Sequence, residues 1–209
     1  MKKLTAVLLA LICVFTLAAC GKTAEKKEFA PGKIEGNVYT SEFAGIKLEA
    51  PDGWKFASDE DIKGALGTAA DSAADIIGEQ NMDAAIENTV TDAVLYDSAT
   101  GSSAAVVFEN MEGTFGDADH SPEEYAGILE NNLKKSGEGF VFDEHETVQL
   151  CGNEYLRAST SLNYQGNEIR QTYFLRKIDG YMLSVCVSGI FTSSEDYDAM
   201  LSMFSALDD

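Results

Sequence analysis

Residues 171–185 read QTYFLRKIDGYMLSV, two runs of aromatic, aliphatic and β-branched residues on either side of Asp179-Gly180. An Asp-Gly pair between two such runs is a strong local signal for a β-hairpin with a two-residue turn. Gln165-Gly166 and Gly152 interrupt the preceding sequence in the same way. The stretch therefore predicts a meander of antiparallel strands over Thr147–Leu150, Glu154–Tyr164, Glu168–Lys177 and Tyr181–Ile190.

The meander also predicts the state of two cysteines, Cys151 and Cys186. Two-residue turns set Cys186 opposite Tyr173, and Tyr173 opposite Ala158 on the next strand. Cys186 is therefore level with Ala158 but two strands away, and Cys151 precedes Ala158 by seven residues along the chain. A disulfide needs Cα atoms within about 7 Å of each other, so this pair is expected to be too far apart to form one. We expect two free thiols, with Cys186 buried in its strand and Cys151 at a turn.

Shorter strands are predicted before the meander. Tyr39–Phe43 and Ile46–Ala50 place apolar residues at alternate positions and flank Ala44-Gly45, a pattern typical of a hairpin. The residues APDGW (50–54) predict a turn with Pro51 at its second position and Gly53 at its last. Two further strands are expected over Thr91–Tyr96 and Ala104–Glu109.

The clearest helix signal begins at Ser121, an N-cap residue that is followed by Pro122 and then by Glu124, which completes a capping box. Gly137 is expected to end this helix. Its apolar face carries Tyr125, Ile128, Leu129 and Leu133.

Two other regions are expected to be helical. Residues 58–88 are rich in Ala, Asp and Glu and predict two or three short helices that start at Ser58 or Asp59. A closing helix is predicted from a capping box formed by Thr192 and Glu195. Its apolar face would carry Tyr197, Met200, Leu201, Phe204 and Leu207. Strands and helices together predict an α+β fold, an antiparallel sheet with helices on its faces in an α/β/α sandwich.

The N-terminus has the pattern of a secretory signal. Lys2 and Lys3 precede an apolar run over 4–17, which is too short to cross a membrane as a helix. Leu17-Ala18-Ala19-Cys20 resembles the lipobox of a bacterial lipoprotein. The resemblance implies cleavage before Cys20 and lipid attachment to its sulfur, and two or more acyl chains hold a protein stably on a membrane. An uncut signal with a chance cysteine at its boundary is the alternative.

These signals divide the chain into a lipoprotein signal peptide over 1–19, a lipidated flexible linker over 20–37 and a single globular domain over 38–209. The linker is expected because its residues are mostly polar and include Pro31, Gly32 and Gly36. The predicted location is extracytoplasmic, with the protein anchored by lipid to the bacterial cell membrane.

The charge of the chain limits its partners. The net charge is −20, and loss of residues 1–19, which contain two lysines and no acid, makes it −22. Such a chain lacks the basic surface that binds phosphate backbones, so nucleic acid is not expected as a partner. Its body is also repelled by anionic lipid headgroups. Solubility alone, a cation or a basic partner would each account for the acidity.

The sequence predicts no catalytic, cofactor-binding or metal-ligating residue. The only histidines are His120 and His145. On a strand, Asp143 would be the one metal-ligating residue on the same face as His145, which is too few to hold a metal ion. Asp117-Ala118-Asp119 could begin a calcium loop, but Pro122 and Ile128 stand where an EF-hand needs Gly and Glu. Trp54, the only tryptophan, is expected either to cap the core or to form a ligand platform.

The order of elements, the PDGW turn and the YFL-xxx-DGY hairpin resemble the PsbP-like fold over about residues 38–207. Bacterial lipoproteins with such domains are similar to this chain. The resemblance implies a binding or assembly module, and it carries no catalytic residues over to this sequence.

We therefore expect a membrane-anchored, extracytoplasmic lipoprotein that acts as a non-enzymatic binding or assembly module. Its expected partners are the membrane, through the N-terminal lipid, and a protein or small ligand of unknown identity. The alternatives are a lipid-tethered hydrolase, which would need a cleft joining a histidine to distant acids, and a small-ligand receptor.

Overall fold

The computed structural model describes residues 28–67, 86–116, 119–136, 139–164, 166–191 and 193–207. The signal peptide, Cys20, Gly137, Thr192 and most of the expected helices over 58–88 lie outside these residues. No helix within them is long and apolar enough to cross a membrane.

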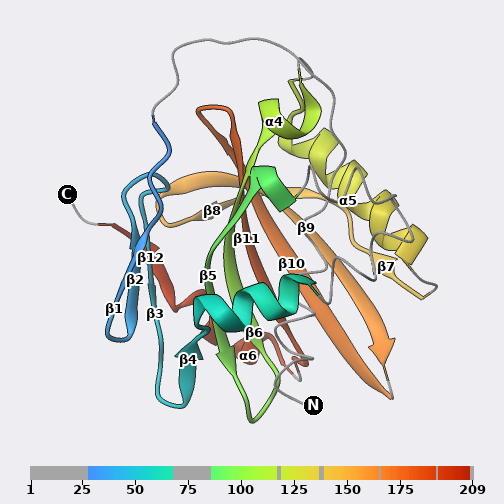
Figure 1. The fold of residues 1–209 in the computed structure, drawn as a ribbon. Helices are drawn as coiled ribbons and strands as arrows, with labels where there is room; N and C mark the ends of the chain where they lie inside the picture. The colour runs from blue at the N-terminus through green and yellow to red at the C-terminus, as the bar shows by residue number, and fades with distance from the viewer. Residues whose placement is uncertain are drawn as a thin grey trace.

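A large antiparallel sheet forms the centre of the molecule (Figure 1). Every pair in it is antiparallel, as the hairpin signals predict. In spatial order the sheet contains β4 (Trp54–Phe56), β5 (Thr89–Asp97), β6 (Ser103–Asn110), β11 (Tyr181–Gly189), β10 (Asn167–Ile178) and β9 (Asn153–Tyr164). The far edge of β9 pairs with β7 (Val141–Phe142) and with β8 (Glu146–Leu150).

The predicted register of the meander is confirmed. Cys186 pairs with Tyr173, and Tyr173 pairs with Ala158. Asp179 and Gly180 both have positive φ, as a two-residue hairpin turn requires. Cys151 and Cys186 are not joined by a disulfide, and Cys186 is buried, as the register predicts.

A second, smaller sheet covers one face of the first. Its order is β1 (Lys33–Glu35), β2 (Val38–Ser41), β3 (Ile46–Glu49) and β12 (Phe204–Ala206). The expected hairpin is its β2–β3 pair. Strand β1 lies inside the region 20–37 that is expected to be a flexible linker.

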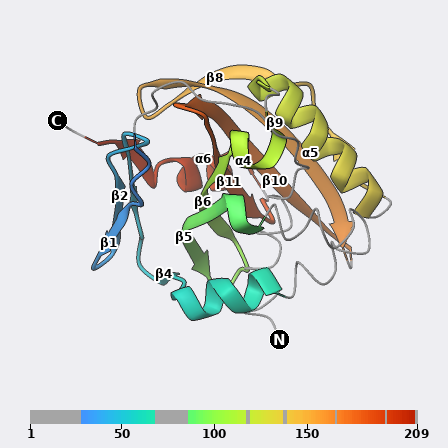
Figure 2. The same cartoon turned by 45° about the horizontal axis from the view of Figure 1, so that its top comes forward.

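Helices cover the opposite face (Figures 1 and 2). The helix α5 (Pro122–Ser136) packs against β9 and β10, and a short helix, α4 (Met111–Phe115), packs beside β6 and β11. Residues 59–67 form a further helix, and the Ser58 hydroxyl accepts a hydrogen bond from the Asp61 N–H at its start. The capping box at Ser121 is present: Glu124 N–H donates to the Ser121 hydroxyl and Ser121 N–H donates to the Glu124 carboxylate.

The closing helix, α6 (Ser194–Leu201), differs from the prediction at both ends. Its capping box uses Ser193 and Asp196 rather than Thr192 and Glu195. The helix stops at Leu201, and Phe204 lies in β12 opposite Leu48. Helix α6 lies in the same layer as the small sheet. Helices therefore cover both faces of the large sheet, as the predicted α/β/α sandwich requires, but one of the two layers also contains a second sheet.

Two hydrophobic cores follow from this layering. One lies between the large sheet and the α4–α5 layer, and includes Met111, Tyr125, Leu129, Tyr173 and Met182. The other lies between the two sheets and α6, and includes Tyr39, Leu48, Phe108, Val185 and Met200. The α+β class with an antiparallel sheet is confirmed.

Candidate functional site

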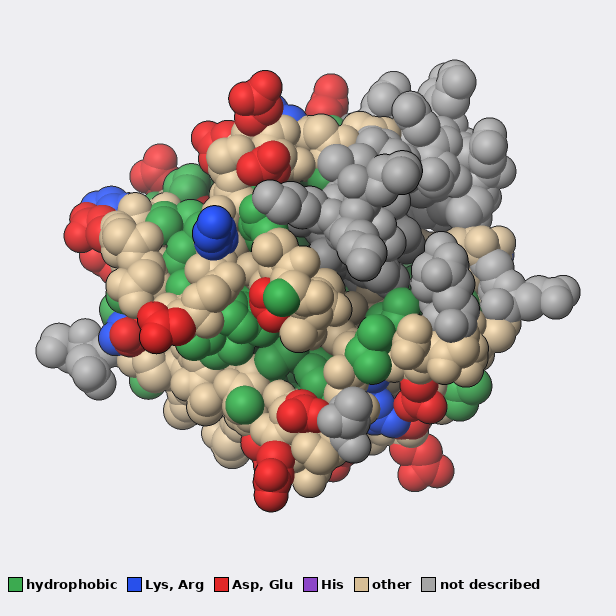
Figure 3. All heavy atoms as spheres, turned by 90° about the horizontal axis from the view of Figure 1, so that it is seen from below, with side chains coloured by type: hydrophobic (Ala, Val, Ile, Leu, Met, Phe, Trp, Pro, Cys, Tyr) green, Lys and Arg blue, Asp and Glu red, His purple; other side chains and the backbone are tan. Residues whose placement is uncertain are grey.

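A groove of about 810 Å³ opens at one end of the second core. It lies between the β3–β4 turn, the β5–β6 turn, the residues after β11, and α6. Figure 3 looks at this end of the molecule, where hydrophobic side chains gather at the centre with acidic side chains beside them. The lining residues used below are Glu49, Trp54, Asp97, Ile190, Phe191, Asp196, Met200 and Met203.

The PDGW turn places Trp54 in this groove. Trp54 N–H donates to the Pro51 carbonyl at 3.1 Å, and Gly53 has φ +89°. Pro51 is therefore the first residue of the turn and Gly53 the third. The sequence predicted that Pro51 would be second and Gly53 last, so the turn begins one residue later than predicted. Trp54 then pairs with Asp97 across β4 and β5. Its side chain is half-buried against the second core, as expected for a residue that caps the core. It also lines the groove, and its use as a ligand platform stays a prediction.

The floor of the groove is apolar. Met200 is buried, Ile190 is 43% exposed, and Phe191 packs edge-on against Tyr197 with ring centroids 5.4 Å apart. These residues follow β11 or belong to α6, so they lie far from Trp54 in sequence. A bulky apolar side chain could cover Trp54 and Ile190 and remove them from water, which is favourable in proportion to the area covered.

Three carboxylates stand at the rim, and each is held by local contacts. Asp97 accepts hydrogen bonds from Ala99 N–H at 2.8 Å and from the Thr100 hydroxyl at 2.8 Å. The Ala99 bond does most to lower the pKa of Asp97 below its ordinary value. Asp196 accepts from Ser193 N–H at 3.1 Å in the α6 capping box, and Glu49 forms an ion pair with Lys47 at 3.0 Å. These contacts hold the three carboxylates in place at the rim of the groove.

The two histidines lie elsewhere and do not meet. His145 Nε2 is 2.7 Å from Glu130 Oε1 on α5, a partner that the sequence did not reveal. Asp143, expected beside His145, instead bonds to Arg170. His120 packs edge-on against Phe115 and lies 3.8 Å from Glu124.

The candidate calcium segment is only partly described. Asp119 forms an ion pair with Lys177. Within the described part of the chain, no group of three or more His, Cys, Asp or Glu is arranged to hold a metal ion.

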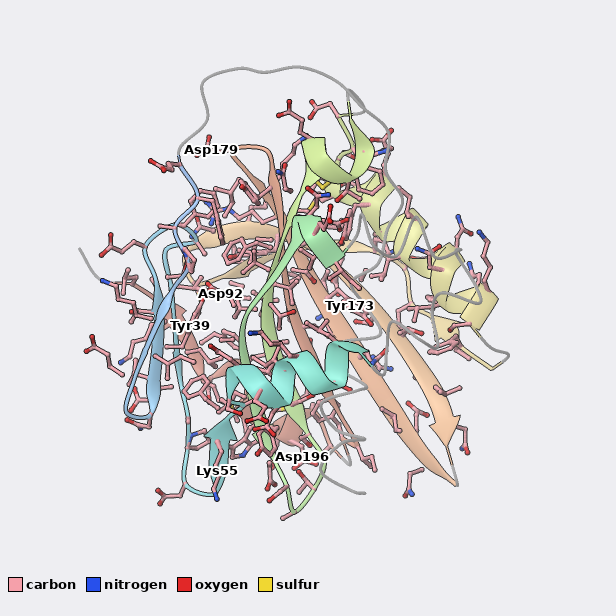
Figure 4. All side chains as sticks on the ribbon, in the orientation of Figure 1. Tyr39, Lys55, Asp92, Tyr173, Asp179 and Asp196 are labelled. Atoms are coloured by element: carbon pink, nitrogen blue, oxygen red, sulfur yellow. The ribbon has the colours of Figure 1, made fainter. Side chains whose placement is uncertain are left out.

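One buried polar contact was not anticipated from the sequence. The Tyr39 hydroxyl donates to Asp92 Oδ2 at 2.5 Å, and Gly32 N–H donates to the same oxygen at 2.8 Å. Figure 4 shows Tyr39 and Asp92 close together between the small sheet and β5. The alternation of apolar residues marks Tyr39 as inward-facing, but it gives no sign of its partner, because Asp92 is the extra residue of a β-bulge between Thr91 and Ala93.

No family model matches the chain, and no curated protein matches it. Solved structures with a similar fold include LpqN of Mycobacterium tuberculosis, a protein involved in cell envelope biogenesis, at 11% identity and a TM-score of 0.43, over 77% of this chain and 82% of that one. The cyanobacterial PsbP of Synechocystis matches at 11% identity and a TM-score of 0.45, over 88% of this chain and 98% of that one.

The Ran-binding protein Mog1p of Saccharomyces cerevisiae matches at 13% identity and a TM-score of 0.41, over 78% of this chain and 91% of that one. All three likenesses concern the fold and say nothing of a ligand. The chain has an α+β fold built on antiparallel sheets, and its structural neighbours include a PsbP.

Proposed function

We propose that the chain is a lipid-anchored, extracytoplasmic lipoprotein that acts as a non-enzymatic binding module, and that the Trp54 groove is its binding site. The groove carries the binding role, because it joins an apolar floor to three oriented carboxylates in one open depression. The location rests on residues 1–20, where a basic start, an apolar run and a lipobox-like end agree.

A binding role fits the groove better than catalysis does. A general base needs a group that is free to take a proton within reach of the substrate. The rim carboxylates instead accept hydrogen bonds or pair with Lys47, and His145 contacts Glu130 on the far side of the large sheet. An enzyme would therefore have to assemble its acid and base from residues other than these.

The anchor is tested by changing Cys20 to Ala in the full-length chain expressed in a bacterium. The variant is expected to remain as an uncut precursor or to leave the membrane fraction, while the wild type stays with the membrane. Mass spectrometry of the mature N-terminal peptide should find acyl chains on Cys20. A mature wild-type peptide without lipid would contradict the proposal.

A further inference from the structure

The groove and the point where the chain enters the domain lie at opposite ends of the molecule. Phe29 stacks on Tyr181 with ring centroids 4.9 Å apart and also contacts Phe108. Tyr181 is the first residue of β11, whereas the groove begins just after Gly189, the last residue of the same nine-residue strand. A strand of this length spans about 26 Å. Figure 4 shows Asp179 at one end, near the start of the described chain, and Asp196 at the other.

This arrangement directs the groove away from the anchoring membrane. Phe29 follows Cys20 by only nine positions in the chain, a distance of at most about 30 Å when fully extended. The aromatic contacts of Phe29 and the Gly32–Asp92 hydrogen bond fix the end of this tether to the Asp179 end of the domain. The groove therefore lies on average farther from the bilayer than the Asp179 end does, and it is open to an occupant from outside the membrane.

The chemistry of the groove selects a cationic occupant with an apolar side chain. Among the described residues that line it, three are acidic and none is Lys, Arg or His. The whole chain carries a net charge of −20, so long-range attraction also favours a basic partner. The apolar floor, with Trp54 and the exposed Ile190, offers a place for one large hydrophobic side chain.

We propose that the groove binds an extended basic peptide segment of a protein that lies outside the anchoring membrane, with one bulky apolar side chain seated against Trp54 and Ile190. The volume of about 810 Å³ suits a few residues of a peptide. Anionic lipid is disfavoured by the same carboxylates. This inference rests on the proposed function, since it names the partner class of the same groove and takes its orientation from the lipid anchor.

The test uses Trp54 as its own reporter, because it is the only tryptophan of the chain. The mature protein in neutral detergent micelles is titrated with acetyl-Lys-Phe-Lys-Leu-Lys-Phe-Lys-amide. Saturable change in Trp54 fluorescence is expected, and it should weaken as salt is added. A peptide with Glu in place of every Lys, and one with Ser in place of every apolar residue, should each bind at least about tenfold more weakly.

Two pairs of variants locate the binding. Ile190→Ser should weaken binding at least about tenfold, whereas Val141→Ser, which changes an even more exposed aliphatic residue on β7, should leave it unchanged. Glu49→Gln should weaken binding about two- to fivefold, the range expected for one exposed charge pair. Asp179→Asn removes the same charge at the opposite end, in a turn that accepts Asn, and should have no effect.

Several results would overturn the inference. These are the absence of saturable binding, equal binding of the Glu peptide, or equal effects within either pair of variants. Binding that appears only after Lys22, Lys26 and Lys27 are changed to Gln would show that the chain's own N-terminal segment occupies the groove. Self-association that Ile190→Ser abolishes would identify a second copy instead. The titration needs no bilayer, so it tests peptide binding independently of the lipid anchor. Peptide binding can be absent although Cys20 is lipidated, and it can be present although Cys20 is not.

Discussion

At the scale of single residues, the hydrogen bond between Tyr39 and Asp92 joins the small sheet to the large one. The ring of Tyr39 is fully buried, and its hydroxyl shares Asp92 Oδ2 with Gly32 N–H. Burial first, and then the Asp92 carboxylate, raise the pKa of Tyr39 far above its ordinary value. Burial likewise raises the pKa of Tyr155 and of Tyr197. Ionisation of these tyrosines is therefore less favourable in the folded than in the unfolded chain.

The sign of the resulting pH dependence follows from linkage. A group whose pKa is higher in the folded than in the unfolded chain contributes its full stability below the unfolded value, here about 10 for tyrosine. That contribution is lost as the pH rises toward the folded value. We therefore expect the free energy of unfolding to fall above about pH 10, by about 1.4 kcal/mol per pH unit for Tyr39 alone.

Urea unfolding at a series of pH values measures this dependence, and tyrosinate absorbance follows ionisation in parallel. The absorbance should show some of the eight tyrosines ionising only when the protein unfolds. Tyr39→Phe should reduce the slope of stability against pH above 10. A native protein in which all eight tyrosines ionise near their ordinary pKa would contradict the buried contact.

At the scale of elements, long strands and the β2–β3 hairpin were predictable, and several of the shortest strands were not. The strands β9 to β11 are bounded by turn residues that determine both their ends and their register, so Cys186 could be placed opposite Tyr173 from the sequence. By contrast, β1, β7 and β12 have three residues or fewer, too few to establish a period of two. Phe204 has helical spacing from Met200, but the helix stops at Leu201 and the chain pairs with β3.

The strand β1 gives the sharpest difference between the sequence-based expectation and the structure. Gly32, which precedes it, was expected to lie in a flexible linker. A Cβ atom at Gly32 would lie 2.4 Å from a ring carbon of Tyr39 and 2.6 Å from the Thr40 carbonyl oxygen. We therefore expect Gly32→Ala to destabilise the domain by about 1–3 kcal/mol, because β1 or the Tyr39 ring must move.

The matched control is Gly127→Ala. Gly127 lies inside α5 with no atom near its would-be Cβ, so the substitution should stabilise the domain by up to about 1 kcal/mol. Urea unfolding of the two variants and the wild type compares these effects. If Gly32→Ala has no effect, the segment before β2 does not pack as described, and the expected linker boundary at residue 37 would stand.

At the scale of the whole molecule, the groove could not be predicted from sequence. Its walls come from 49–54, 97–102, 190–191 and 196–203, which only the sheet order brings together. Periodicity identifies the buried face of each element, but it does not show which ends of separate elements meet. Trp54 alone indicated a possible site from the sequence, because a single large aromatic residue beside a turn is typical of either a core or a binding surface.

The arrangement of tether and groove leads to a prediction about orientation on a bilayer. Phe29 follows Cys20 by nine positions in the chain, which span at most about 30 Å when fully extended. The domain can therefore rotate above the membrane, but its Asp179 end stays nearer to the membrane on average. Trp54 lies at the other end, separated from Asp179 by the length of β11.

Lipid vesicles that carry a spin label on their headgroups test this orientation. In vesicles of the lipidated protein, the headgroup label should quench Trp54 fluorescence weakly, because quenching requires close approach. The comparison is a Trp54→Phe, Tyr181→Trp variant, which moves the only tryptophan to the opposite end beside Phe29 and should be quenched more strongly. Circular dichroism of both proteins checks that the fold is unchanged. Stronger quenching of Trp54 would mean that the groove faces the bilayer, and equal quenching would mean that neither end is nearer to it. Either result would contradict the predicted orientation.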